Sequence, residues 1–204
     1  PVNAIDLEGM VALAKEKRAD LVFVGPDDPL AAGMVDRMQE AGIKAFGPTS
    51  AAARIESSKV WAKQLMIRHA IPTAPAEVFD DAAAALRCVE RAPEGSLVIK
   101  ADGLTQGKGV VVASTRAEAS AAVRAMMEER AFGDAGRTVL VEERMHGVEV
   151  SVFAFVSGEH VSAEVAACDY KRVNDGDEGP NTGGMGAYSP PEFWTPELAA
   201  RVRQ

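Results

Sequence analysis

The chain has 204 residues, of which 47% are hydrophobic and 25% charged, and its formal net charge is −8. This composition is typical of a globular protein with a core, not of a disordered chain. The acidic balance argues against a nucleic-acid-binding protein, which needs a basic face. Cys88 and Cys168 lie far apart without a metal-binding spacing, so we expect a reducing cytoplasm. No apolar run reaches the roughly 20 residues of a membrane span.

Residues 1–75 predict part of a parallel α/β domain. A helix that Asp6 can cap, an apolar strand at 21–24, a helix at 30–41 and a buried strand at 43–46 alternate with short links. This order predicts a doubly wound parallel sheet. Ligands bind beyond the carboxyl ends of such strands, which places residues 25–29, including Asp27 and Pro29, and residues 47–49 at a binding edge. Ordinary turn chemistry is the alternative explanation of these residues.

Residues 49–70 predict a helix in one or two pieces, with Ser57 or Ser58 as cap of the second piece. Lys59 then lies in the first turn, where a cation opposes the helix dipole. A phosphate bound at that helix N-terminus would explain the lysine, and a solvated surface lysine is the alternative.

Residues 76–147 predict a small α+β lobe. We expect a strand at 76–79, a helix at 82–91 capped by Asp80 or Asp81, and a strand at 138–142. Thr115 and Glu118 form a capping box for a helix that runs to about residue 129. Residues 142–147 are the expected connection out of this lobe.

A glycine-rich hairpin lies at the centre of this lobe. Strands at 97–100 and 110–113 flank a loop with the basic residues Lys100 and Lys108 and the glycines Gly103, Gly107 and Gly109. Backbone N–H groups of such a loop can converge on an anion, which predicts a flap that closes over phosphates. The loop is one residue short of a Walker A motif, has glycine at the Ser/Thr position and leads into a strand. A surface hairpin that needs glycine only to turn is the alternative.

Residues 148–204 predict the start of a second, antiparallel lobe. Strands at 148–156 and 161–167 pair across a turn at 157–159, and a helix begins after Thr195. Between them, residues 169–190 predict a long polar loop with a cationic pair and a second glycine cluster. Such loops usually carry function, and this one predicts a site for a second anionic substrate. The chain opens at Pro1 without methionine and stops within a predicted helix, so we expect a fragment.

Several segments together resemble one enzyme family. GPDDPLAAG, GPTSAAARIESSKVWAK, VIKADGLTQGKGV, VEERMHGVEVS and DYKRVNDGDEGPNTGGMGAYSP occur in the order found in phosphoribosylamine-glycine ligases, which belong to the ATP-grasp superfamily. NTGGMGAYSP after a Lys-Arg pair is the most specific of these motifs. The resemblance implies an α/β ATP-grasp fold, with a partial N-terminal domain at 1–75, a small lobe at 76–147 and the start of the second lobe at 148–204.

The resemblance also implies a reaction in purine synthesis. ATP, glycine and 5-phosphoribosylamine give glycinamide ribonucleotide, ADP and phosphate through a glycyl phosphate, with no side-chain nucleophile. Lys100 and Arg172 would stabilise charge. Bound ATP would contact Lys59, Lys100, Gly103, Gly107, Lys108, Gly109, Glu142, Glu143, Met145 and Glu149. The other substrates would contact Asp27, Pro29, Lys171, Arg172, Asn181, Thr182, Gly183, Gly184, Met185 and Gly186.

In this resemblance residues 142–145 form the hinge whose backbone contacts adenine, and Glu149 binds the ribose hydroxyls. The family uses Mg²⁺ or Mn²⁺, held by a Glu and an Asn in a C-terminal part, so no metal ligand is expected here. The resemblance further implies a cytoplasmic monomer with small-molecule substrates and neither nucleic acid nor membrane as partner. A fragment without catalysis, a non-catalytic nucleotide-binding module and another ATP-grasp carboxylate-amine ligase remain open alternatives.

Overall fold

The structure, a computed structural model, describes residues 1–105, 108–176 and 178–203. It divides into two compact units, Pro1–Met145 and His146–Gln204. Each unit combines helices with short β-sheets, as the sequence predicts for an α/β protein. The finer division at residue 75 stays a prediction.

The first unit begins with alternating helices and short strands. In chain order these are α1 (Leu7–Glu16), β1 (Val22–Phe23), α2 (Asp27–Ala32), α3 (Met34–Glu40), β2 (Ala45–Phe46) and α4 (Ser50–Ser57). The two strands pair in parallel, as predicted, with Val22 opposite Ala45. The Asp6 carboxylate accepts the Gly9 N–H at 3.0 Å and caps α1. Apolar side chains from α1, α3 and β1 then form a small core around Val35 and Met38, which are fully buried.

Two predictions for this segment are wrong in detail. The single helix expected at 30–41 is two helices, because Gly33 adopts φ +93° and ends α2 in the left-handed conformation. The strands expected to be buried are only partly covered. The Phe23 side chain is 64% exposed and stacks on Phe46 with ring centroids 5.0 Å apart.

The remainder of the first unit is a four-stranded antiparallel sheet with helices. The strands are β3 (Ala76–Phe79), β4 (Leu97–Ala101), β5 (Val110–Val112) and β6 (Val139–Glu143), arranged in the order β3-β6-β4-β5. The helices are α5 (Lys59–Arg68), α6 (Ala82–Arg91), α7 (Arg116–Met127) and a 3₁₀ turn, Gly133–Gly136. The predicted hairpin is confirmed, since β4 and β5 pair antiparallel. The Ser58, Asp81 and Thr115 side chains cap α5, α6 and α7, also as predicted.

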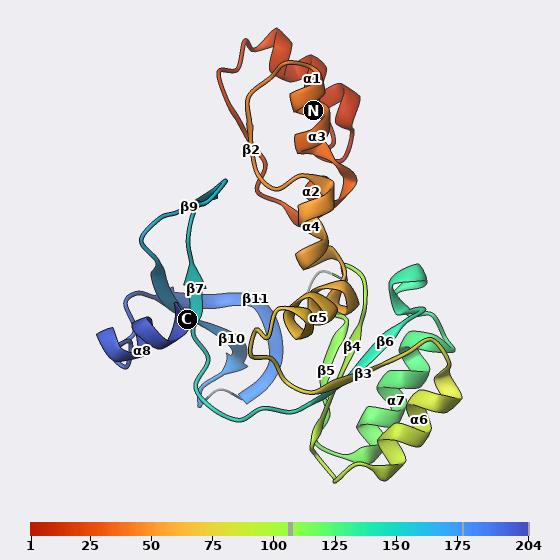
Figure 1. Cartoon of the computed structure of the whole chain (residues 1–204). Helices are drawn as coiled ribbons and strands as arrows, with labels where there is room; N and C mark the ends of the chain where they lie inside the picture. The colour runs from red at the N-terminus through yellow and green to blue at the C-terminus, as the bar shows by residue number, and fades with distance from the viewer. Residues whose placement is uncertain (106–107, 177, 204) are drawn as a thin grey trace. The chain divides into compact units, whose positions relative to one another are not determined.

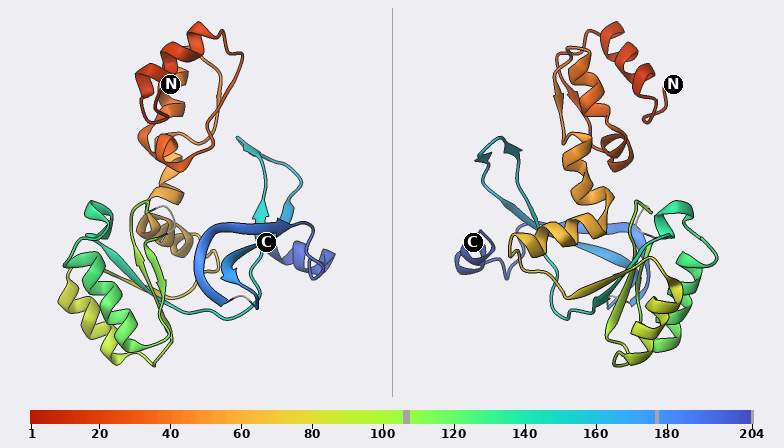
Figure 2. Two further views of the ribbon diagram at one scale, coloured as in Figure 1. Left: turned by 180° about the vertical axis from the view of Figure 1, so that it is seen from behind. Right: turned by 45° about the vertical axis from the view of Figure 1, so that its right-hand side comes forward.

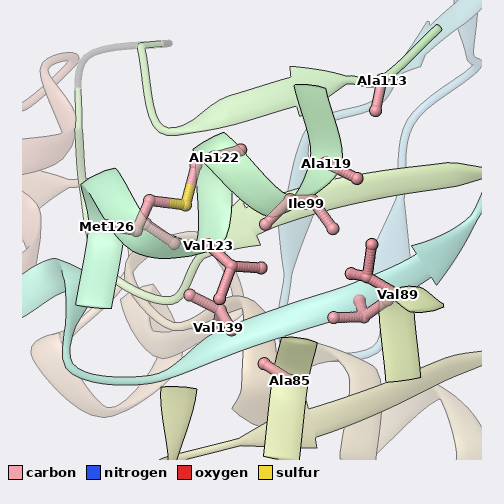
Figure 3. Packing of buried hydrophobic residues seen from close by; sticks show 11 residues of the cluster. Ala85, Val89, Ile99, Ala113, Ala119, Ala122, Val123, Met126 and Val139 are labelled. Atoms are coloured by element: carbon pink, nitrogen blue, oxygen red, sulfur yellow. The ribbon is translucent and has the colours of Figure 1, made fainter. Parts of the chain in front are cut away.

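Helices α6 and α7 lie side by side on one face of this sheet (Figures 1 and 2). Alternate residues of the strands point toward them, so Ile99 of β4 and Val139 of β6 are buried against Val123 of α7. Figure 3 shows these side chains together with Ala85 and others between the two layers. The strand residues between these buried positions therefore point to the opposite face of the sheet.

The second unit is antiparallel, as predicted. Its elements are β7 (Ser151–Phe153), β8 (Val156–Ser157), β9 (His160–Val161), β10 (Val165–Asn174), β11 (Glu178–Tyr188) and α8 (Pro196–Val202). β8 and β9 form the small hairpin around the predicted turn, and β7 pairs with β10. The strand expected at 148–156 is therefore shorter and interrupted.

The prediction of a long polar loop at 169–190 is wrong, because most of these residues form the two strands β10 and β11. They pair antiparallel with Cys168 opposite Tyr188 and with two register irregularities. The Tyr170 and Tyr188 rings stack with centroids 5.8 Å apart. Cross-strand aromatic contact and antiparallel pairing with β10 favour the extended state here, even though glycine and polar residues are common in turns. The final helix is confirmed, with Thr195 as its cap.

Candidate functional site

The strand alternation that buries Ile99 and Val139 against α6 and α7 turns Lys100 and Glu142 to the opposite face of the sheet. Glu142 lies opposite Val98 in the β4–β6 register, which places Lys100 diagonally across from it, within reach of a long side chain. A cavity of about 380 Å³ lies on this face. Its lining comprises Ile55, Glu56, Lys59, Ala62, Lys63, Met66, Thr73, Ala74, Lys100, Val110, Leu140, Glu142 and Met145.

Glu142 is the central charged group of this cavity. It is 6% exposed, and its two carboxylate oxygens pair with different ammonium groups, Oε1 with Lys63 and Oε2 with Lys100. Burial alone would raise the pKa of Glu142, but the hydrogen bonds and charges of Lys100 and Lys63 outweigh it and lower the pKa below its usual value of 4.5. Glu142 is therefore a carboxylate at neutral pH.

Lys63 is held at three points. Its Nζ donates to Thr73 Oγ1 at 2.6 Å, to the Ala74 carbonyl at 2.8 Å and to Glu142 Oε1. These bonds use the three donors of the ammonium group, and the residue is 4% exposed. Lys63 is thus committed to the protein, whereas the Lys100 side chain is 29% exposed and can reach a ligand in the cavity.

The N-terminus of α5 is already occupied by a carboxylate of the protein. Asp102 Oδ1 accepts the Val60 N–H at 2.8 Å and the Ser58 hydroxyl at 3.0 Å, and Ser58 Oγ accepts the Trp61 N–H. The N–H groups of Lys59, Val60 and Trp61 thus already have acceptors on Asp102 and Ser58, which argues against a phosphate bound on the helix end itself. Lys59 still lines the cavity, donates to the Gly103 carbonyl at 2.9 Å, and has a pKa lowered mainly by burial.

The predicted flap is described on both sides of residues 106–107, and Gly107 lies outside the described residues. Thr105 organises the loop by accepting the Gly109 N–H on its hydroxyl at 2.9 Å and the Lys108 N–H on its carbonyl at 3.0 Å. A Cβ on Gly103 would meet the Ala135 methyl at 2.7 Å, so glycine is needed there for close packing. Lys108 is exposed.

The residues predicted as the adenine hinge lie at the end of β6. Glu143 is exposed and points away from the cavity that Glu142 lines, as alternation along a strand requires. Its N–H donates to the Pro75 carbonyl at 2.9 Å, and the Arg144 N–H donates to the Ser96 carbonyl at 2.8 Å. Met145 lines the cavity and is 73% exposed.

A second cluster of charges lies in the second unit. Lys171 Nζ is 3.1 Å from Glu149 Oε2 and 3.1 Å from Asp169 Oδ1. The hydrogen bond to Asp169 is the main reason that the pKa of Lys171 is raised. Thr182 Oγ1 donates to the Lys171 carbonyl at 2.9 Å and accepts the Gly184 N–H at 3.1 Å. The structure thus brings Glu149, predicted for ATP, together with Lys171, predicted for the other substrates.

The other predicted substrate residues have simpler positions. Gly183, Met185 and Gly186 are exposed on β11, Arg172 is half-buried on β10, and the side chain of Asn181 lies outside the described part of the chain. In the first unit Asp27 is exposed in the first turn of α2 and Pro29 is buried. Neither of these two residues lines the cavity that contains Lys100.

Sequence reasoning missed Lys63, Asp102 and Asp169. A signal for Lys63 was available, because Lys59 and Lys63 are four residues apart and share one face of α5. Its partner Glu142 is 79 positions away, and no local pattern links the two.

The family follows from a match to known sequences. The model of the phosphoribosylglycinamide synthetase ATP-grasp (A) domain matches residues 57–204, and that of the N domain of the same enzyme matches residues 1–56. The chain belongs to the phosphoribosylglycinamide synthetase family. The resemblance drawn from the sequence motifs is thereby confirmed.

Curated relatives agree with this assignment. Phosphoribosylamine--glycine ligase of Xylella fastidiosa is 50% identical over 99% of this chain and 47% of its own length. The enzyme of that name from Chlorobaculum tepidum is 48% identical over 100% of this chain and 48% of its own. The chain therefore spans about half the length of the curated relatives it matches.

Solved structures confirm the ATP-grasp fold. Phosphoribosylamine--glycine ligase from Thermotoga maritima superposes with a TM-score of 0.71 and 32% identity, covering 88% of this chain and 44% of its own. D-alanyl-alanine synthetase A from Vibrio cholerae has a TM-score of 0.65 at 18% identity, covers 90% of this chain and 56% of its own, and supports the fold alone. Within residues 1–105, 108–176 and 178–203, no helix has the length and apolarity to cross a membrane.

Proposed function

We propose that this member of the phosphoribosylglycinamide synthetase family takes part in the ATP-dependent ligation of glycine to 5-phosphoribosylamine. The observation that carries the proposal is about 50% identity, over nearly the whole chain, to relatives named for that reaction. Because those relatives are about twice as long, the part assigned to this chain is nucleotide binding, flap closure and a portion of the substrate site.

The first step requires neutralisation of phosphate charge. In the proposed reaction a glycine carboxylate oxygen attacks the γ-phosphorus, ADP leaves, and glycyl phosphate forms. Lys100 and Lys59 line the cavity from β4 and α5 and can place two ammonium groups on the phosphates. Gly103, Lys108 and Gly109 form the flap over them, and the backbone near Met145 contacts the adenine.

The second step requires an amine held beside the acyl phosphate. The amine of 5-phosphoribosylamine attacks the glycyl carbonyl, phosphate leaves, and the proton on nitrogen is lost to give the amide. The sugar phosphate would bind Lys171, Arg172 and the exposed glycine strand with Thr182. Phosphate must compete there with Glu149 and Asp169 for the Lys171 ammonium group.

The proposed cofactor is Mg²⁺ or Mn²⁺, which would neutralise phosphate charge during transfer. Over the described residues no group of three or more His, Cys, Asp or Glu side chains is arranged to hold a metal ion. No step is therefore assigned to a metal ligand of this chain. The proposal also includes a cytoplasmic location and a monomeric state.

The test is ADP release with MgATP, adding glycine and 5-phosphoribosylamine singly and together, measured for the 204-residue chain and for a protein of the relatives' full length that contains it. We expect turnover only when both substrates are present, and only in the longer protein, because the chain spans about half the length of its relatives. Turnover with D-alanine in place of glycine would contradict the proposal and indicate another carboxylate-amine ligase. Tight MgATP binding without turnover in the longer protein would favour a non-catalytic nucleotide-binding module. Lys17→Met is a matched control, because Lys17 is exposed and its ammonium group pairs at the surface with the neighbouring Glu16.

A further inference from the structure

One buried charge in the cavity has no role in the proposed reaction. Lys63 is 4% exposed, makes three hydrogen bonds and does not have a free donor for a phosphate. Burying a lysine is costly unless it is paired, so its place beside a nucleotide cavity calls for an explanation.

The explanation lies in the two oxygens of Glu142. One oxygen is bound to Lys63 and the other to Lys100, the lysine that the proposed function assigns to phosphate. When phosphate draws Lys100 away, a buried carboxylate loses one of its two counter-ions. If Lys100 were the sole counter-ion, that transfer would leave an uncompensated charge at a site that is 6% exposed.

We propose that Lys63 is a positioning residue that stays bound to Glu142 while nucleotide phosphates take Lys100, so that Glu142 remains a compensated carboxylate throughout nucleotide binding. This inference rests on the proposed nucleotide site. It assigns the two lysines different tasks: Lys100 exchanges between Glu142 and the ligand, and Lys63 does not move. The Thr73 hydroxyl and the Ala74 carbonyl hold Lys63 in place.

The charges that face Glu142 come from several elements. Lys63 reaches it from α5 and Lys100 from β4, and both contact its oxygens. Lys59 from α5 and Glu56 from α4 line the same cavity. Asp102 lies at the N-terminus of α5 beside Lys59. The charges of Glu56 and Asp102 act on Lys59, so Lys63 and Lys100 are the lysines whose ion pairs with Glu142 the structure gives.

The proposal makes a prediction about protons. In Lys63→Met the released Glu142 has no contacting counter-ion, so it takes up a proton when MgADP binds. Affinity for MgADP should then increase by up to about tenfold for each unit of falling pH between about pH 8 and pH 6. In the wild type Glu142 stays ionised in both states, so its protonation adds no pH dependence in this range.

The experiment is calorimetric titration of the 204-residue chain with MgADP in two buffers of different ionisation enthalpy, which gives proton uptake. We expect nearly one additional proton for Lys63→Met relative to wild type. We expect none for Lys63→Arg, which keeps the charge, and none for Lys63→Met/Glu142→Gln, which removes the carboxylate. Equal proton uptake in Lys63→Met and wild type would overturn the proposal.

A nucleotide-free measurement separates this inference from the proposed function. Lys100→Met reproduces the loss of Lys100 to phosphate, and the ¹³C shift of the Glu142 carboxyl group reports its ionisation. We expect Glu142 to remain ionised at neutral pH in Lys100→Met. A neutral Glu142 in that variant would refute the role of Lys63, whether or not MgADP binds. Failure of the wild type to bind MgADP, with Glu142 ionised in Lys100→Met, would instead refute the nucleotide site.

A second measurement covers the case in which Lys63→Met does not fold. In the wild type, the ¹⁵N ammonium signals of both lysines can be followed during the MgADP titration. We expect the Lys100 signal to shift and the Lys63 signal to stay slow to exchange with water. A large shift of Lys63 with loss of its protection would contradict the proposal.

Discussion

Replacing Lys100 by methionine tests whether its ammonium group binds the nucleotide phosphates. This group pairs with Glu142 in the structure and would have to leave it to bind phosphate. Methionine keeps most of the apolar stem and removes the charge. Because Glu142 retains Lys63, we expect the fold to survive the change. A hydrogen bond to a charged group contributes about 1.5–3 kcal/mol, and Lys100 must give up Glu142 to make one. The hydrogen bond gained with phosphate is therefore partly offset by the ion pair lost with Glu142. We expect Lys100→Met to weaken MgADP binding by roughly tenfold, or about 1.4 kcal/mol.

The assay is calorimetric titration with MgADP, with thermal unfolding measured in parallel to show that the variant is folded. Lys17→Met serves as the control, since it removes an exposed lysine that pairs with Glu16, and its affinity should equal that of the wild type. If Lys100→Met is folded and binds MgADP as tightly as the control, the assignment of Lys100 to phosphate is refuted.

Three further predictions concern stability. Lys63→Met should lower the free energy of unfolding by about 3 kcal/mol in urea denaturation, because it removes one partner of a buried ion pair; a loss no greater than that of Lys17→Met would contradict this. The pKa of Glu142 is lowered in the folded state, so its stabilisation is present above the usual value of 4.5 and is lost as pH falls through the lower folded value. Glu142→Gln should therefore lose less stability than wild type on acidification, and identical acid unfolding profiles would count against the pairing. Gly136→Ala should cost about 1–3 kcal/mol, because its Cβ would lie 2.4 Å from the Met126 carbonyl oxygen, and an unchanged urea midpoint would show that this contact relaxes freely.

Much of the fold could be predicted because it depends on neighbours in the chain. The caps at Asp6, Asp81, Thr115 and Thr195 were visible in the sequence, since a side chain and the N–H group that it accepts are two or three residues apart. The β4–β5 hairpin was visible because two β-branched runs flank a loop with glycine.

The errors arise where tertiary contacts or one backbone angle decide the outcome. Gly33 is compatible with a helix interior, but here it takes a left-handed conformation and ends α2. Residues 178–188 look like a turn region because of their glycines, yet pairing with β10 extends them into a strand.

The candidate site was found only in part for the same reason. Lys100 and Lys59 were recognised from their positions beside a glycine loop and a helix start. The buried network of Lys63, Glu142 and Thr73 joins segments far apart in the sequence, so it needed the fold.

The most direct test of the central claim is affinity labelling with an adenine nucleotide whose terminal phosphate carries a lysine-reactive aldehyde. After reduction and proteolysis, mass spectrometry would identify the modified lysines. The account predicts labelling at Lys100 or Lys59, protection by MgATP, and no labelling of buried Lys63. Labelling that falls on exposed lysines such as Lys17, or that MgATP does not suppress, would contradict the claim that this cavity binds the nucleotide phosphates.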